Sequence, residues 1–142
     1  MAIKTRVLVY PETGKIRSYG EAIYDLFGGE KPVDKIPPAY SCNNDRLVFI
    51  GVKVGRQLPD DLRLFCGSMD KSRATYVAIF GNGDESTINA VANTLREAGT
   101  EVVGEILNVD VPFLSFIKKL KPEEKARIEE WAQKIFDDVV SR

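Results

Sequence analysis

The stretch Arg6-Val7-Leu8-Val9-Tyr10-Pro11-Glu12-Thr13-Gly14-Lys15-Ile16 decides the fold that this sequence predicts. Its apolar run ends at Tyr10 and Pro11, a Thr13-Gly14 turn follows, and apolar residues with helical spacing begin at Ile16. This order indicates a strand, a tight loop and the first turn of a helix. In an open α/β sheet, such a loop lies at the carboxyl end of a central strand. Backbone N–H groups there, with the helix N-terminus behind them, form a site suited to an anion such as phosphate.

The composition is typical of a globular domain and excludes several classes of function. The chain has 142 residues, of which 44% are hydrophobic and 29% are charged, so we expect a single domain spanning residues 1–142. A net charge of −1 gives no general attraction to nucleic acid or to an anionic membrane. No apolar run approaches the ~20 residues of a membrane span, and we expect a cytoplasmic protein. The absence of histidine removes the commonest general base.

The two cysteines, Cys42 and Cys66, match no metal-binding spacing. Reduced thiols are favoured over a disulfide, although the sequence leaves both open. We expect Cys66, which follows Phe65, to be a small buried residue. Cys42 lies in a Ser-Cys-Asn loop and is expected to be exposed.

Strand and helix patterns alternate along the chain. Continuous apolar runs at residues 47–52 and 76–80 are typical of strands buried on both faces of a parallel sheet. The predicted strands are residues 7–10, 33–36, 47–52, 76–80 and 101–107, and the predicted helices are residues 16–27, 60–65, 88–98 and 122–140. Right-handed crossovers then give a five-stranded parallel α/β sheet of strand order 2-1-3-4-5 with helices on both faces. The segment from Pro37 to Asp45 is too short for a substantial helix and should be a loop or a single turn.

Three loops should meet at one end of this sheet. They follow the first, third and fourth predicted strands and span residues 11–16, 53–59 and 81–86. Their glycines and small polar residues permit close approach of the backbone to a planar or phosphorylated ligand. The sequence indicates no catalytic constellation and no metal site, so a stand-alone enzyme is the weakest interpretation.

The sequence resembles short-chain flavodoxins along nearly its whole length. The likeness rests on residues 10–14 as the phosphate loop, on residues 51–59 as the second loop and on Ala78-Ile79-Phe80-Gly81-Asn82-Gly83-Asp84 as the third. The resemblance implies a flavodoxin-like three-layer sandwich that binds flavin mononucleotide (FMN) without covalent attachment. It also implies an electron carrier whose partner is a reductase or another oxidoreductase.

The resemblance also implies a set of cofactor-binding residues. They are Glu12, Thr13, Gly14, Lys15, Ile16, Arg17, Val52, Lys53, Val54, Gly55, Gly81, Asn82, Gly83 and Asp84. Within this set, Thr13 is the expected hydroxyl donor to the phosphate and Lys15 the expected counter-charge. Asp84 either contacts the edge of the flavin or only caps the helix that follows it.

Three features depart from the flavodoxin pattern. Pro11 and Ile16 stand where flavodoxin phosphate loops usually carry hydroxyl residues, and neither of the other two loops offers a Trp or Tyr to the isoalloxazine ring. The chain is also nearly neutral, whereas typical flavodoxins are strongly acidic. These departures predict weak, salt-sensitive FMN binding. They leave open an alternative function, a binding or regulatory domain that keeps the fold and has lost flavin.

Three aromatic residues near the end of the chain are predicted to have structural roles. Trp131 lies on the apolar stripe of the last helix and should belong to the core. Phe113 and Phe116 precede that helix. Packing against the edge of the sheet is their default prediction, and a hydrophobic docking patch is the alternative.

Overall fold

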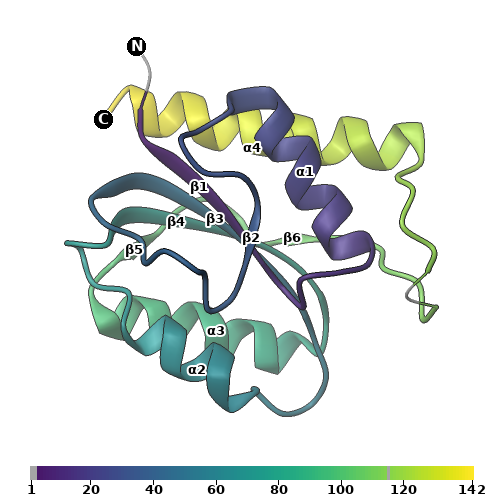
Figure 1. The fold of residues 1–142 in the computed structure, drawn as a ribbon, viewed down its shortest axis with the longest axis horizontal. Helices are drawn as coiled ribbons and strands as arrows, with labels where there is room; N and C mark the ends of the chain where they lie inside the picture. The colour runs from purple at the N-terminus through teal and green to yellow at the C-terminus, as the bar shows by residue number, and fades with distance from the viewer. Residues whose placement is uncertain (1–2, 115) are drawn as a thin grey trace.

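The computed structural model describes residues 3–114 and 116–142, which form one parallel β-sheet with helices on both faces (Figure 1). The strands are β1 (Thr5–Tyr10), β2 (Asp34–Lys35), β3 (Asp45–Val54), β4 (Ala74–Gly83), β5 (Glu101–Val102) and β6 (Leu107–Asn108). The helices are α1 (Lys15–Phe27), α2 (Asp60–Gly67), α3 (Glu85–Ala98) and α4 (Pro122–Val140). Helices α1 and α4 cover one face of the sheet, and α2 and α3 cover the other (Figure 1).

The order of the strands confirms the predicted topology. Neighbouring strands run β2, β1, β3, β4, β5, and β6 also pairs with β4. All of these pairings are parallel. The chain passes from β2 to β3 through residues 36–44 without forming a helix, as the composition of that segment predicted. Because the order of the strands reverses at β1, the carboxyl ends of β1 and β3 flank the switch point at which open α/β sheets bind ligands.

The last predicted strand is wrong in its extent, because two short strands stand where one was expected over residues 101–107. β5 lies beside Tyr76 and Val77 of β4, and β6 lies beside Phe80 and Gly81. Between β5 and β6, Gly104 has a φ of 72°. That left-handed conformation interrupts the extended chain.

β3 and β4 are longer than predicted, and this changes the second and third loops. The sequence pattern ends these strands at residues 52 and 80, but in the structure they remain paired as far as Val54 and Gly83. A Cβ at Gly83 would lie 1.7 Å from the carbonyl O of Val54, and the φ of Gly83 is +128°. Glycine here allows two backbones to approach closely inside a sheet, whereas the sequence pattern indicated a turn.

Alternation along β3 divides the core between the two faces. Phe49 packs on the α1/α4 face, where the Trp131 ring lies edge-on to it at a centroid distance of 5.9 Å. Ile50 and Val52 pack on the α2/α3 face. The same alternation places Lys53 on the α1/α4 face.

Two predictions for single residues are wrong. Cys42 is buried, because it packs with Ile36 in the apolar cluster on the α2/α3 face. Phe113 and Phe116 are 94% and 72% exposed and do not pack on the edge of the sheet. Cys66 is buried as predicted, and both cysteines are free thiols. Burial raises the pKa of the Cys42 thiol to about 11.

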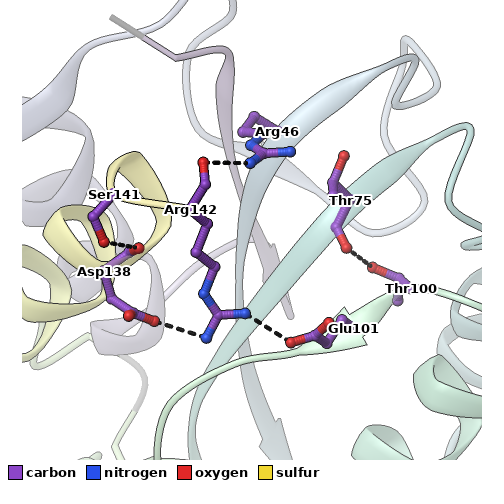
Figure 2. A network of polar contacts seen from close by, with 7 residues as sticks. All are labelled: Arg46, Thr75, Thr100, Glu101, Asp138, Ser141 and Arg142. Carbon is purple, nitrogen blue, oxygen red and sulfur yellow. Dashed lines mark hydrogen bonds and ion pairs between the residues drawn. The ribbon is translucent and has the colours of Figure 1, made fainter. Parts of the chain in front are cut away.

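At the amino ends of the strands, a polar network ties the end of α4 to the sheet (Figure 2). Arg142 donates from Nη1 to Oε2 of Glu101 at 2.8 Å and from Nη2 to Oδ2 of Asp138 at 2.9 Å. Arg46, near the start of β3, donates to the backbone O of Arg142 at 3.4 Å. These contacts join α4, β3 and β5 at the end of the sheet opposite the loop of residues 11–14.

Candidate functional site

The loop of residues 11–14 leaves the carboxyl end of β1 and leads directly into α1. Gly14 is the N-cap residue of α1, with a φ of 91° and no side-chain hydrogen bond that caps the helix. The first backbone N–H groups of a helix have no acceptor within the helix. Together with the helix dipole, these groups favour an anion at this position.

A cavity of about 60 Å³ lies against this loop. The residues that line it are Pro11, Thr13, Gly14, Lys15, Ile16, Lys53, Val111, Pro112 and Leu114. The cavity thus brings together the predicted phosphate loop and one residue predicted in the second loop. Its third wall, residues 111–114, was missed from the sequence. The topology contained the signal, because this segment follows the last strand and so leaves the sheet at the same carboxyl end.

Lys15 lies at this cavity but is held in an ion pair. Its side chain is only 4% exposed, and its Nζ lies 2.7 Å from Oε1 of Glu124 on α4. Oε2 of the same carboxylate accepts from Lys15 at 2.8 Å and from the Tyr19 hydroxyl at 3.2 Å. Burial alone would raise the pKa of Glu124, but the hydrogen bond from Lys15 and its charge hold that pKa below its usual value. The positive charge of Lys15 is therefore neutralised inside the protein.

Arg17, the other basic residue predicted at the phosphate loop, also has partners within the chain. Its Nε lies 3.2 Å from Oε1 of Glu21. It donates from Nη1 to the carbonyl O of Glu12 and from Nη2 to the carbonyl O of Val33, both at 3.2 Å. Arg17 thus ties the loop to the segment before β2, which positions the loop rather than offering charge to a ligand.

Lys53 differs from these two residues. It is half-buried on β3, it lines the cavity with Thr13 and Gly14, and the structure shows no ion pair for it within residues 3–114 and 116–142. Its neighbour across the strands, Asn82 of β4, donates to the carbonyl O of Val109 at 2.9 Å. Lys53 is therefore the cation that remains available at the cavity.

Solved structures with the same architecture identify the fold. A flavodoxin from Streptococcus pneumoniae TIGR4 matches with a TM-score of 0.70 at 15% identity, over 96% of this chain and 99% of its own. A short-chain flavodoxin associated with a PDU bacterial microcompartment gives a TM-score of 0.70 at 13% identity, over 98% and 99% of the two chains. A flavodoxin from the domain Archaea gives 0.67 at 16% identity, over 96% and 99%. The chain has the flavodoxin fold. No family model and no curated protein matches the sequence.

The residues around the start of α1 fit the phosphate end of FMN, the cofactor expected from the sequence. The uncapped start of α1, the positive φ of Gly14 and the nearby Lys53 suit a phosphate group. The cavity does not enclose the isoalloxazine ring, since about 60 Å³ is well below the ~300–1,000 Å³ of sites that enclose small molecules. None of the residues that line it is aromatic. A flavin here would therefore hold its ring at the surface.

The other predicted cofactor residues lie outside this cavity. Val52 and Val54 are buried in the apolar cluster on the α2/α3 face. Gly55 is exposed in the loop after β3, and Gly81 and Gly83 are strand residues of β4.

The predicted third loop is reduced to Asp84, because β4 ends at Gly83 and α3 begins at Glu85. The side chain of Asp84 accepts from the backbone N of Thr87 at 3.2 Å and from Oγ of Ser86 at 2.6 Å, so it caps α3. These hydrogen bonds, with that from Ser86 the stronger, hold the pKa of Asp84 below its usual value. Of its two predicted roles, capping is the one the structure shows.

Among residues 3–114 and 116–142, no group of His, Cys, Asp and Glu side chains is arranged to hold a metal ion. In the same part of the chain, no helix is both long enough and apolar enough to cross a bilayer.

Proposed function

We propose that this protein binds FMN at the loop of residues 11–14 and carries electrons between partner proteins. The observation that supports this most directly is the uncapped N-terminus of α1, which borders a phosphate-sized cavity at the switch point of a flavodoxin-fold sheet. The likeness to flavodoxins, at 13–16% identity, supports the fold, and the site supports the ligand.

Each part of the chain has a defined task in this proposal. The backbone N–H groups at the start of α1 and the hydroxyl of Thr13 hold the phosphate, and Gly14 lets the backbone approach it. Bound FMN supplies the redox chemistry, which belongs to the cofactor. The chain needs no general acid or base, in keeping with a sequence that has no histidine. The partner is a reductase or oxidoreductase in the cytoplasm.

Spectroscopy of the purified protein tests this proposal. Protein that retains flavin is yellow, and added apo-protein should raise the fluorescence anisotropy of FMN, with saturation at a stoichiometry of one. We expect the affinity to fall from low to high salt, because a half-exposed cation is screened by ions. Gly14→Val should abolish binding, because a branched side chain is strained at a φ of 91° and covers the phosphate position. A colourless protein that leaves the anisotropy of FMN unchanged at either salt concentration contradicts the proposal.

The alternative is a flavodoxin-fold binding or regulatory domain without flavin. The small cavity and its lack of aromatic walls favour it. The same titration separates the two functions, because a regulatory domain leaves the fluorescence anisotropy of FMN unchanged.

A further inference from the structure

The three basic side chains near the phosphate position are in different electrostatic states. Lys15 is paired at 2.7 Å with Glu124, and Arg17 is paired at 3.2 Å with Glu21. Lys53 faces the same cavity without an ion pair in the described part of the chain. A cation already paired with a carboxylate adds less net field at a nearby ligand than an unpaired cation does.

We propose that Lys53 on β3 is the cation that binds the phosphate of the flavin, and that Glu124 on α4 sets the charge preference of the site by neutralising Lys15. This rests on the proposed function and names the residues that separate FMN from riboflavin, which lacks the phosphate. The preference for FMN then depends on two elements outside the phosphate loop. Lys53 adds attraction for the phosphate, and Glu124 limits it.

The position of Glu124 explains how it holds Lys15 so firmly. Glu124 lies in the first turn of α4, and its Oε1 also accepts from the backbone N of Lys121 at 2.8 Å, which closes the end of the helix. Tyr19 donates to the same carboxylate at 3.2 Å and to the carbonyl O of Asp110 at 2.9 Å. Since three groups, the Lys15 ammonium, the Tyr19 hydroxyl and the backbone N of Lys121, hold this carboxylate, a phosphate arriving at the cavity does not readily draw Lys15 away from it.

The test compares the dissociation constants of FMN and riboflavin for each variant, because their ratio isolates the contribution of the phosphate. Lys53→Met should lower the preference for FMN by about tenfold, the loss expected for a charge-assisted hydrogen bond. Lys53→Arg should restore most of that preference. Lys71→Met, which removes one exposed positive charge beyond the opposite end of β4, is the matched control and should leave the ratio unchanged.

Variants of the ion pair give the opposite signature. Glu124→Gln keeps a hydrogen-bonding group beside Lys15 but removes the negative charge, so the preference for FMN should rise. The double variant Lys15→Met with Glu124→Gln removes both charges and should keep the ratio within about twofold of the wild type. Circular dichroism and Tm establish that each variant is folded. An unchanged ratio in Lys53→Met overturns the proposal. The proposal is also overturned if the double variant loses the preference for FMN by the roughly tenfold factor expected for Lys53→Met.

Failure of the flavin proposal is distinguishable from failure of this inference. If the wild type binds neither flavin, FMN is not the ligand, and stabilisation by inorganic phosphate tests the cation directly. Phosphate should then raise the Tm of the wild type and of Lys71→Met but not of Lys53→Met. Equal stabilisation of all three, or of none, overturns the role of Lys53.

Discussion

The two ends of the sheet are built differently. At the amino ends of the strands, Arg142 bridges α4 and β5 through two ion pairs, and Arg6 donates from Nη1 to the carbonyl O of Tyr40 at 2.9 Å. At the carboxyl ends, α1 begins without a cap, and Lys53 lines the cavity without an ion pair in the described part of the chain. The comparison indicates that polar side chains at the amino ends of the strands stabilise the fold. At the carboxyl ends, the first N–H groups of α1 and the Lys53 ammonium remain accessible to a ligand.

Each end also contains an exception that tests this contrast. Lys15 and Glu124 form a closed ion pair at the carboxyl end. At the amino end, Nε and Nη2 of Arg6 and Oδ1 of Asp45 have no hydrogen-bond partner among the residues that the structure describes. Because those three atoms are buried, the lack of a partner reduces the stability of the fold.

The largest expected effect comes from the close approach of backbones between β3 and β4. Gly83→Ala would place a Cβ 1.7 Å from the carbonyl O of Val54 in a residue whose φ is +128°. We expect the free energy of unfolding to fall by about 4 kcal/mol, since the two strands must separate. Gly55→Ala, one residue beyond the paired end of β3, would place a Cβ with no atom within 4 Å and should change stability by less than about 0.5 kcal/mol. Urea denaturation of both variants measures the difference, and equal effects would show that β3 and β4 do not pair to their ends.

Arg6→Met should have the next largest effect, and it acts at the other end of the sheet. Arg6 is 4% exposed, and its Nη2 lies 3.8 Å from Oδ2 of Asp34. Burial raises the pKa of Asp45, with the charges of Lys4 and Arg6 opposing that shift. Removing the guanidinium takes away one of the two cations that offset burial of the Asp45 carboxylate and leaves Lys4, whose Nζ lies 3.9 Å from Oδ1 of Asp45. We therefore expect a loss of about 2 kcal/mol in unfolding free energy.

A double variant and a binding measurement sharpen this prediction. Asp45→Asn in the Arg6→Met background should recover part of the lost stability, because it removes the charge that Arg6 opposed. FMN affinity of folded Arg6→Met should equal that of the wild type. A loss of FMN affinity without unfolding would mean that the two ends are coupled.

The fold was predictable because its signals are local and repeated. The Val7–Tyr10 run, the two central apolar runs and the helical stripe around Ile128 each follow from one face or two faces being buried. The ends of the strands were not predictable from such patterns. The sequence pattern around Gly83 fits both a turn and a close approach of two strands. Only the position of the Val54 backbone in the folded structure distinguishes the two.

The site was predictable only in part. Thr13 and Gly14 were predicted from the loop itself, because a turn between strand and helix is a local pattern, and both line the cavity. The partner of Lys15 was not found, because Glu124 lies 109 residues away and reaches Lys15 only through the packing of α4 beside α1. The sequence shows that Lys15 carries a positive charge that could bind an anion. Only the folded structure shows that this charge is already paired with Glu124.

A pH titration of stability separates the closed ion pair from the ligand cation. The pKa of Glu124 is lowered in the folded state, so the pair contributes stability above the unfolded pKa of about 4.5 and loses it as the pH falls through the folded value. The unfolding free energy of the wild type should therefore fall more steeply below about pH 4.5 than that of Glu124→Gln. Glu129→Gln, on the same helix, is the control and should keep the slope of the wild type. If Glu124→Gln has an unchanged slope, the pair with Lys15 is not formed in solution.

The smallest expected effect is that of Arg142→Ala, although its network is the most connected at the amino end. Its ion pairs with Glu101 and Asp138 are solvent-exposed, and exposed pairs contribute little because water and salt screen them. Arg142 is more than an isolated pair, however, since its guanidinium also lies 5.0 Å from the centre of the Tyr76 ring. We therefore expect Tm to fall by roughly 2 °C at low salt and by less at high salt.

Arg63→Ala, which breaks a single exposed pair within α2, should have a smaller effect still. FMN affinity should stay unchanged in both variants, because neither arginine lines the cavity at the start of α1. Weaker FMN binding in a folded Arg142→Ala variant would show that the network at the amino ends of the strands is coupled to the cavity at their carboxyl ends. The contrast between the two ends of the sheet would then be wrong.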